Sequence, residues 1–68
     1  MSRVAKVVKI VANSPNGVEA AIHEGLSKAS KTVRGIHGLK VTDWTIGVED
    51  NKIASHKVTL EVAFGLDE

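Results

Sequence analysis

The chain has 68 residues and no cysteine, and its nine basic and eight acidic residues give a formal net charge of +1. Without cysteine, neither a disulfide nor a thiolate metal site is available. Charges of both signs that nearly cancel also argue against a nucleic-acid binder, whose usual footprint is a basic stripe.

The first predicted element is a strand over residues 3–12, which are rich in Val, Ile and Lys. The four residues that open the chain lack the apolar run and small-residue cleavage site of a signal peptide. No stretch of the sequence is long and apolar enough to span a membrane. We therefore expect one soluble, cytoplasmic domain over residues 1–68, with no membrane partner.

A helix is predicted to begin in the segment that follows this strand. Ser14 is one candidate cap, with Pro15 at the first helical position. Asn16 is the other candidate, because Glu19 stands three residues later as in a capping box. The sequence leaves both starts open.

Apolar residues then recur at steps of three or four, which is the spacing of one helical face. They are Val18, Ile22, Leu26, Ala29 and Val33. Gly25 interrupts this helix and weakens it by about 1 kcal/mol relative to alanine. A tight contact with a strand or another chain would explain a glycine there. Gly35 is expected to be the C-terminal cap.

Two further strands are predicted over residues 37–48 and 52–66, joined by a turn in which Asp50-Asn51 suits positive φ. The third strand alternates clearly. One of its faces carries His56, Val58, Leu60, Val62, Phe64 and Leu66, and the other carries Ser55, Lys57, Thr59, Glu61 and Ala63. An unbulged second strand would place Leu39 and Val41 on one face, and Gly38, Lys40, Thr42, Trp44 and Ile46 on the other.

This order of strand, helix, strand, strand predicts an α+β fold in which a three-stranded antiparallel sheet curls around one helix. A hairpin cannot pair the first strand, so we expect it to lie beside the third strand. A domain of this size buries only about 60% of its unfolded surface. Scaffolds this short usually need disulfides, metals or oligomerisation, and without cysteine we expect oligomerisation.

Four segments, in this order, resemble the dodecin family. They are Ser14-Pro15, the run Ala29-Ser30-Lys31-Thr32-Val33-Arg34, the turn Val48-Glu49-Asp50-Asn51-Lys52-Ile53, and the closing Lys57-Val58-Thr59-Leu60-Glu61-Val62-Ala63-Phe64. The match covers nearly the whole chain. The resemblance implies twelve identical subunits assembled as a hollow dodecamer that binds flavin (riboflavin, FMN or FAD) and stores or buffers it without catalysis.

The resemblance also implies where the ligand would lie. In the family, a Trp early in the second strand stacks on the flavin ring, and a Gln in the third strand contacts its polar edge. Gly38 and Lys57 stand at these positions here. Glycine has no ring to stack, and lysine donates hydrogen bonds but accepts none.

Three further residues are candidates for the site. An unbulged strand would point Trp44 to the same face as Gly38, so Trp44 is either a ligand-stacking residue from a neighbouring subunit or an interface residue. His37 lies next to Gly38 and is a weaker ligand candidate. By the resemblance, Asp43 lies near the ligand or a cation, and copies of it could meet at a symmetry axis.

Lys57 itself has two interpretations, a ligand contact or an interface lysine paired with Asp43 or Glu61. His56 is expected to be a partly buried structural residue. No nucleophile with a base and an orienting partner is evident, so an enzyme is not expected. The leading hypothesis is a flavin-binding homododecamer, and the alternative is a flavin-free shell with a structural, cation-binding or other small-ligand role.

Overall fold

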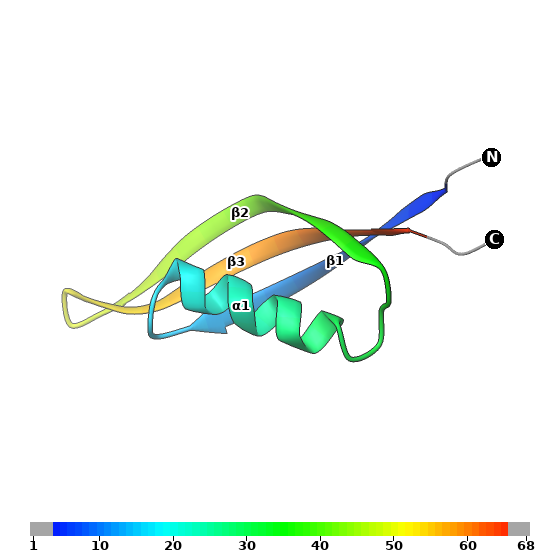
Figure 1. Cartoon of the computed structure of the whole chain (residues 1–68). Helices are drawn as coiled ribbons and strands as arrows, with labels where there is room; N and C mark the ends of the chain where they lie inside the picture. The colour runs from blue at the N-terminus through cyan, green and yellow to red at the C-terminus, as the bar shows by residue number, and fades with distance from the viewer. Residues whose placement is uncertain (1–3, 66–68) are drawn as a thin grey trace.

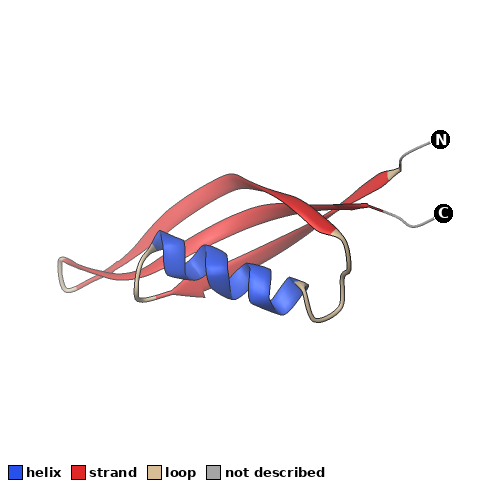
Figure 2. Ribbon diagram, viewed as in Figure 1, coloured by secondary structure: helices blue, strands red, loops and turns tan. Residues whose placement is uncertain are grey.

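The computed structural model describes residues 4–65, which form a three-stranded antiparallel sheet with one helix against it (Figures 1 and 2). The elements are β1 (Ala5–Ser14), α1 (Val18–Ala29), β2 (Ile36–Glu49) and β3 (Lys52–Gly65). The predicted α+β order is confirmed. The predicted strand limits at residues 3 and 66, and the side chain of Leu66, lie outside the described residues.

The strands lie in the order β1-β3-β2, so β1 pairs with β3 after the helical crossover, as predicted. Both neighbours of β3 run antiparallel to it. As a result β1 and β2 are edge strands whose outer backbone groups have no partner in the sheet. Within residues 4–65, α1 has neither the length nor the apolar composition that a membrane-crossing helix needs.

The core follows the alternation predicted for β3. Val58, Leu60 and Val62 are fully buried, and the first two form a core cluster with Ala21 of α1, which is also fully buried. Ile10 and Ala12 of β1 pack against this cluster because they stand opposite Leu60 and Val58 in the register. The side of the sheet that faces α1 is called the inner face below, and the opposite side is called the outer face.

Both ends of α1 differ from the prediction. Neither Ser14 nor Asn16 caps the helix; Gly17 is the N-cap residue, at φ 122°, and Ser14 Oγ instead accepts a hydrogen bond from the Asn16 backbone N–H at 3.1 Å. α1 ends at Ala29, so the predicted stripe member Val33 lies beyond it.

Gly35 is not the helix cap. It lies in the loop that leads to β2, at φ 74°, and its carbonyl accepts a hydrogen bond from the Gly65 N–H at 3.1 Å. A Cβ on Gly35 would stand 3.2 Å from the Gly65 carbonyl oxygen. Glycine is therefore required by this close contact with the end of β3 and by the positive φ.

The turn between β2 and β3 has the predicted chemistry. Asp50 and Asn51 have φ of 52° and 63°, and the flanking Glu49 and Lys52 are paired in the register. Two consecutive residues at positive φ make the two-residue hairpin whose twist matches that of the strands. This turn therefore sets the pairing between the end of β2 and the start of β3.

The faces of β2 are reversed part-way along the strand. Val41 stands opposite Leu60 and Asp43 stands opposite Thr59, so Thr42 is an extra residue in a bulge. The Thr42 hydroxyl donates to the Thr59 carbonyl at 3.3 Å. Beyond the bulge, residues that simple alternation places on one face lie on the other.

The predicted faces of β2 are therefore right before the bulge and wrong after it. Gly38 and Lys40 lie on the outer face, opposite Ala63 and Glu61. Trp44 and Ile46 stand opposite Val58 and His56, which places them on the inner face. The prediction that Trp44 shares a face with Gly38 is wrong, because it assumed an unbulged strand.

Gly25 meets the sheet, as its position in the helix suggested. A Cβ built there would lie 2.9 Å from Leu60 Cδ1 and 3.3 Å from Ile10 Cδ1. Replacing Gly25 by valine should lower the free energy of unfolding by about 1–3 kcal/mol through overpacking. Urea denaturation followed by circular dichroism measures this loss.

Ser27→Val is the matched control for Gly25→Val, because Ser27 is an exposed residue of the same helix. Its effect should stay within about 0.5 kcal/mol. Equal urea midpoints for the two variants would show that α1 is not closely packed against the sheet at Gly25.

Candidate functional site

Lys57 lies near the middle of the sheet's outer face. It stands between Asn13 of β1 and Thr45 of β2, and its side chain is exposed. Asp43 stands opposite Thr59, one step along the same face, which makes it a diagonal neighbour of Lys57. The register therefore favours Asp43 as the carboxylate nearest to Lys57 within the chain.

Glu61 has different neighbours on this face. It stands between Lys9 of β1 and Lys40 of β2, in a row of alternating charge across the three strands. Opposite charges in directly opposed positions contribute roughly 0.2–1 kcal/mol. Of the two predicted carboxylate partners for Lys57, the register thus assigns Glu61 to other lysines.

Gly38 lies on the same outer face but far from Lys57. It stands opposite Ala63, which is six residues from Lys57 along β3. Six residues of strand span about 20 Å. A ligand of flavin-ring size therefore cannot touch Gly38 and Lys57 of one chain, and a site that uses both positions needs two copies of the chain.

His37 lies in the first bulge of β2, between Ile36 and Gly38, and is exposed. Together with Gly38 it lines a pocket of ≈ 630 Å³ between the end of α1 and the start of β2. This pocket, called the β2 pocket below, is otherwise lined by Leu26, Ser30, Val33, Gly35, Ile36 and Leu39. The structure thus brings His37 and Gly38 together at one end of the sheet.

Trp44 lies on the inner face and is 51% exposed. Its ring centroid is 6.4 Å from that of His56, with 33° between the ring planes. His56 is half-buried, as predicted, and its Nδ1 atom is buried without a hydrogen-bond partner. The thickness of the sheet separates Trp44 from Gly38 and Lys57 of the same chain.

Asp43 is exposed, and its Oδ1 accepts a hydrogen bond from the Trp44 backbone N–H at 3.1 Å. Among residues 4–65, no three His, Cys, Asp or Glu side chains gather closely enough to hold a metal ion. Calcium takes six to eight oxygen ligands. Asp43 alone would therefore supply too few oxygen ligands for such a cation.

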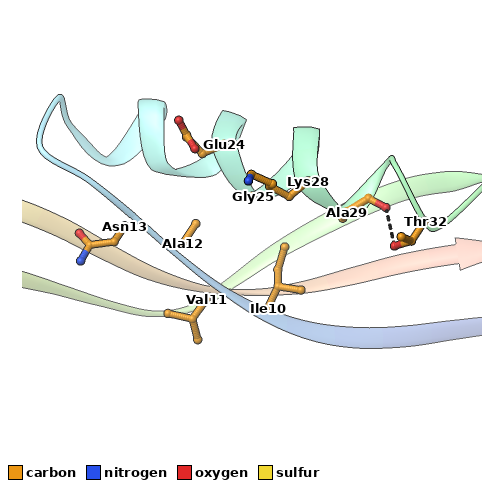
Figure 3. A pocket seen from close by; sticks show the side chains of 9 residues that line it. All are labelled: Ile10, Val11, Ala12, Asn13, Glu24, Gly25, Lys28, Ala29 and Thr32. Carbon is orange, nitrogen blue, oxygen red and sulfur yellow. Dashed lines mark hydrogen bonds between the residues drawn. The ribbon is translucent and has the colours of Figure 1, made fainter.

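A second groove lies between α1 and β1, with none of the predicted site residues in it (Figure 3). Its volume is ≈ 420 Å³, and small residues of both elements, Ala12, Gly25 and Ala29, line it. Glu24 and Lys28 of α1 also line this groove.

One group of exposed apolar residues on β2 was not predicted from the sequence. Val41, Trp44 and Ile46 form an exposed apolar stripe on the inner face of β2, beside the part of the sheet that α1 covers. Simple alternation puts Val41 on the face opposite to Trp44, so the pattern alone conceals the stripe. The sequence signal that marks it is the polar pair Thr42-Asp43 between apolar residues.

Comparisons with known proteins agree with this fold. The family model described as Dodecin matches residues 4–67. A curated protein named Dodecin, from Thermus thermophilus, is 35% identical over 68 residues, which are 100% of this chain and 99% of that protein.

Solved structures are also similar. A dodecin from Streptomyces davaonensis superposes with a TM-score of 0.92 at 35% identity, and the match covers 100% of both chains. A protein from Mycobacterium tuberculosis, described as a calcium dodecin with a novel calcium-binding site, has a TM-score of 0.79 at 31% identity. That match covers 94% of this chain and 91% of the other.

Proposed function

This chain belongs to the dodecin family, and from that premise we propose that it is a non-enzymatic protein that holds a small ligand between the subunits of a homododecamer. The observation that supports a site between subunits is the separation of Gly38 from Lys57. The two positions share the outer face but lie six residues apart along β3. The proposal retains the cytoplasmic location expected from the sequence.

Flavin, as riboflavin, FMN or FAD, is the first ligand in this proposal. Lys57 is exposed on the outer face and its ammonium group can donate hydrogen bonds to a ring carbonyl or a phosphate. Gly38 leaves open space over Ala63, because a Cβ there would meet only the Ala63 Cβ, at 3.9 Å. A bound flavin would therefore keep a polar contact, to Lys57, and would find open space at Gly38 where the family has an aromatic ring.

The second candidate is a flavin-free shell that binds a cation. Two observations favour it. Gly38 brings no ring to the outer face, and Trp44 lies on the inner face. The similar protein from Mycobacterium tuberculosis is described as binding calcium. Copies of Asp43 that meet at a symmetry axis would then supply the oxygen ligands.

Adding riboflavin or FMN to the metal-free protein should give saturable but shallow quenching of flavin fluorescence. Losing one stacking contact costs roughly 0.5–1.5 kcal/mol beyond the lost area, or about twofold to tenfold in affinity. A fluorescence titration against subunit concentration measures the dissociation constant and the stoichiometry. Lys57→Ala should weaken the binding further, and Ser27→Ala should not change it.

Flavin fluorescence that stays constant up to tens of micromolar subunit would eliminate the flavin form of the proposal. Calcium titration by calorimetry then tests the second candidate. In that case calcium should bind to the wild type, and Asp43→Asn should abolish the heat of binding.

A further inference from the structure

Lys57 brings a positive charge to a row of the outer face that holds no carboxylate. Its neighbours in the row across the three strands, Asn13 and Thr45, are both uncharged and exposed. The carboxylate of Asp43 stands only at the diagonal position, where neighbours are about 7–8 Å apart. It also accepts a hydrogen bond from the Trp44 backbone N–H. A ligand that covers this row therefore meets an ammonium group whose nearest opposing charge is one diagonal step away.

The neighbouring rows of the outer face leave the same sign of charge. The row of Glu61 also holds Lys9 and Lys40, so two lysines share its one carboxylate. With Lys57 and Asp43, the three successive rows carry three lysines and two carboxylates. α1 lies against the inner face (Figure 1), so the sheet separates its charged side chains from Lys57. The outer face around Lys57 is therefore net positive.

Gly38, the other position of the proposed site, gives no preference to a flat aromatic ligand. Oxidised flavin is planar and electron-poor, and it gains most from stacking on an electron-rich ring such as indole. Gly38 has no ring, and a Cβ there would meet only the Ala63 Cβ, at 3.9 Å. Gly38 also lines the β2 pocket, and Trp44 lies on the inner face. The stacking contact that would favour the oxidised form is therefore replaced by open space.

We propose that this site binds the reduced, anionic form of flavin more tightly than the oxidised form, because the ammonium group of Lys57 attracts the charge that reduction creates. The inference rests on the proposed function, which places the flavin between Lys57 of one copy and Gly38 of another. Two electrons and one proton convert neutral oxidised flavin into the reduced anion. The electrons come from an external reductant, and the protein contributes only the charge of Lys57.

The two forms of flavin differ at the atoms that face a hydrogen-bond donor. Ring N1 and the adjacent carbonyl oxygen are neutral acceptors in oxidised flavin, and they share the negative charge in the reduced anion. Lysine donates hydrogen bonds and accepts none, so the acceptor's charge is what changes between the forms. A charge near N1 is a known means of tuning flavin electronics.

The expected preference is about tenfold, since the attraction between two unit charges near a protein surface is partly screened by water and salt. Binding and reduction are linked, so a tenfold preference equals a rise of about 30 mV in the two-electron midpoint potential of the bound flavin.

The experiment compares the two redox forms of riboflavin, which has no phosphate for Lys57 to bind. Anaerobic equilibrium dialysis at mildly alkaline pH, with and without dithionite, gives the dissociation constant of each form. The wild type should bind the reduced form about tenfold more tightly, and Lys57→Gln should bind both forms equally. Lys57→Arg keeps the charge and should keep the preference. Lys57 is exposed, so both variants should fold as the wild type does.

The midpoint potential of bound riboflavin is an independent readout. It should exceed that of free riboflavin by about 30 mV in the wild type and should equal it in Lys57→Gln. Equal binding of both forms by the wild type, or a preference that persists in Lys57→Gln, would overturn the inference and leave the proposed flavin site intact. A wild type that binds neither form at tens of micromolar subunit would overturn both.

Discussion

Replacing Leu60 by alanine should leave the subunit largely unfolded at room temperature and so prevent assembly. Leu60 is fully buried between α1 and the sheet, and its Cδ1 lies beneath Gly25. Removing such a side chain costs about 2–5 kcal/mol, and more where the surroundings cannot collapse into the space. Gly25 has no side chain to move into the cavity.

The loss is large compared with the total. At roughly 0.05–0.15 kcal/mol per residue, a chain of this length has a free energy of unfolding of only about 3–10 kcal/mol. The proposed oligomerisation would add to that value by mass action. The wild type, which assembles under the proposed function, should therefore show a stability that rises with subunit concentration, whereas the unfolded variant should not. Urea denaturation followed by far-ultraviolet circular dichroism, at two protein concentrations, measures both effects.

Ile53→Ala is the control for Leu60→Ala. Ile53 belongs to the same strand and loses a side chain of the same size, but it is 63% exposed. Its cost should be below about 1 kcal/mol, because only a fraction of the apolar area is buried. If both variants lost the same stability, the core would not be centred on Leu60.

The parts of the fold that were predictable are those set by local patterns. The alternation of β3 placed Val58, Leu60 and Val62 on one face, because a strand has a period of two. The Asp50-Asn51 pair predicted the hairpin because few other residues tolerate positive φ. The helix, the strands and their order along the chain follow from such signals, each of which lies within a few residues of sequence.

The bulge at Thr42 was not predictable in this way. It depends on a hydroxyl that reaches the Thr59 carbonyl of another strand, 17 residues away in sequence. Gly35 is a similar case, because its partner Gly65 is distant in sequence. A glycine after a helical stripe normally indicates a helix cap, and only the tertiary contact distinguishes the two roles.

Of the candidate site, the sheet face on which its two positions lie was predictable. The resemblance fixed the two positions, and the structure places both Gly38 and Lys57 on the outer face. Parity reasoning then suggested Trp44 as a substitute ring on that face, and the bulge reverses this. One extra residue in the strand thus places the single tryptophan of the chain on the inner face, away from the proposed ligand position on the outer face.

The double variant Gly38→Trp with Lys57→Gln should bind flavin at least tenfold more tightly than the wild type. The new ring would add stacking worth roughly 0.5–1.5 kcal/mol beyond the area that it buries. The amide would donate and accept, whereas lysine only donates. Gly38 is not at positive φ, and a Cβ there meets only Ala63, so the backbone and the space both allow a side chain.

The sharpest control for this double variant places the same ring in the same row of the sheet. Val7 stands opposite Ala63 on β1, as Gly38 does on β2, and Val7 is 56% exposed. Val7→Trp with Lys57→Gln therefore adds identical groups on the outer face, two strands away from the family's ring position. A gain for both double variants would assign the effect to Lys57→Gln or to added apolar surface, and not to a ring at position 38. A gain for neither would mean that neighbouring copies no longer leave a cleft at Gly38. A gain only for the variant with Gly38→Trp would show that the cleft persists and lacks only its ring, because both proteins carry Lys57→Gln and a new tryptophan in the same row of the sheet.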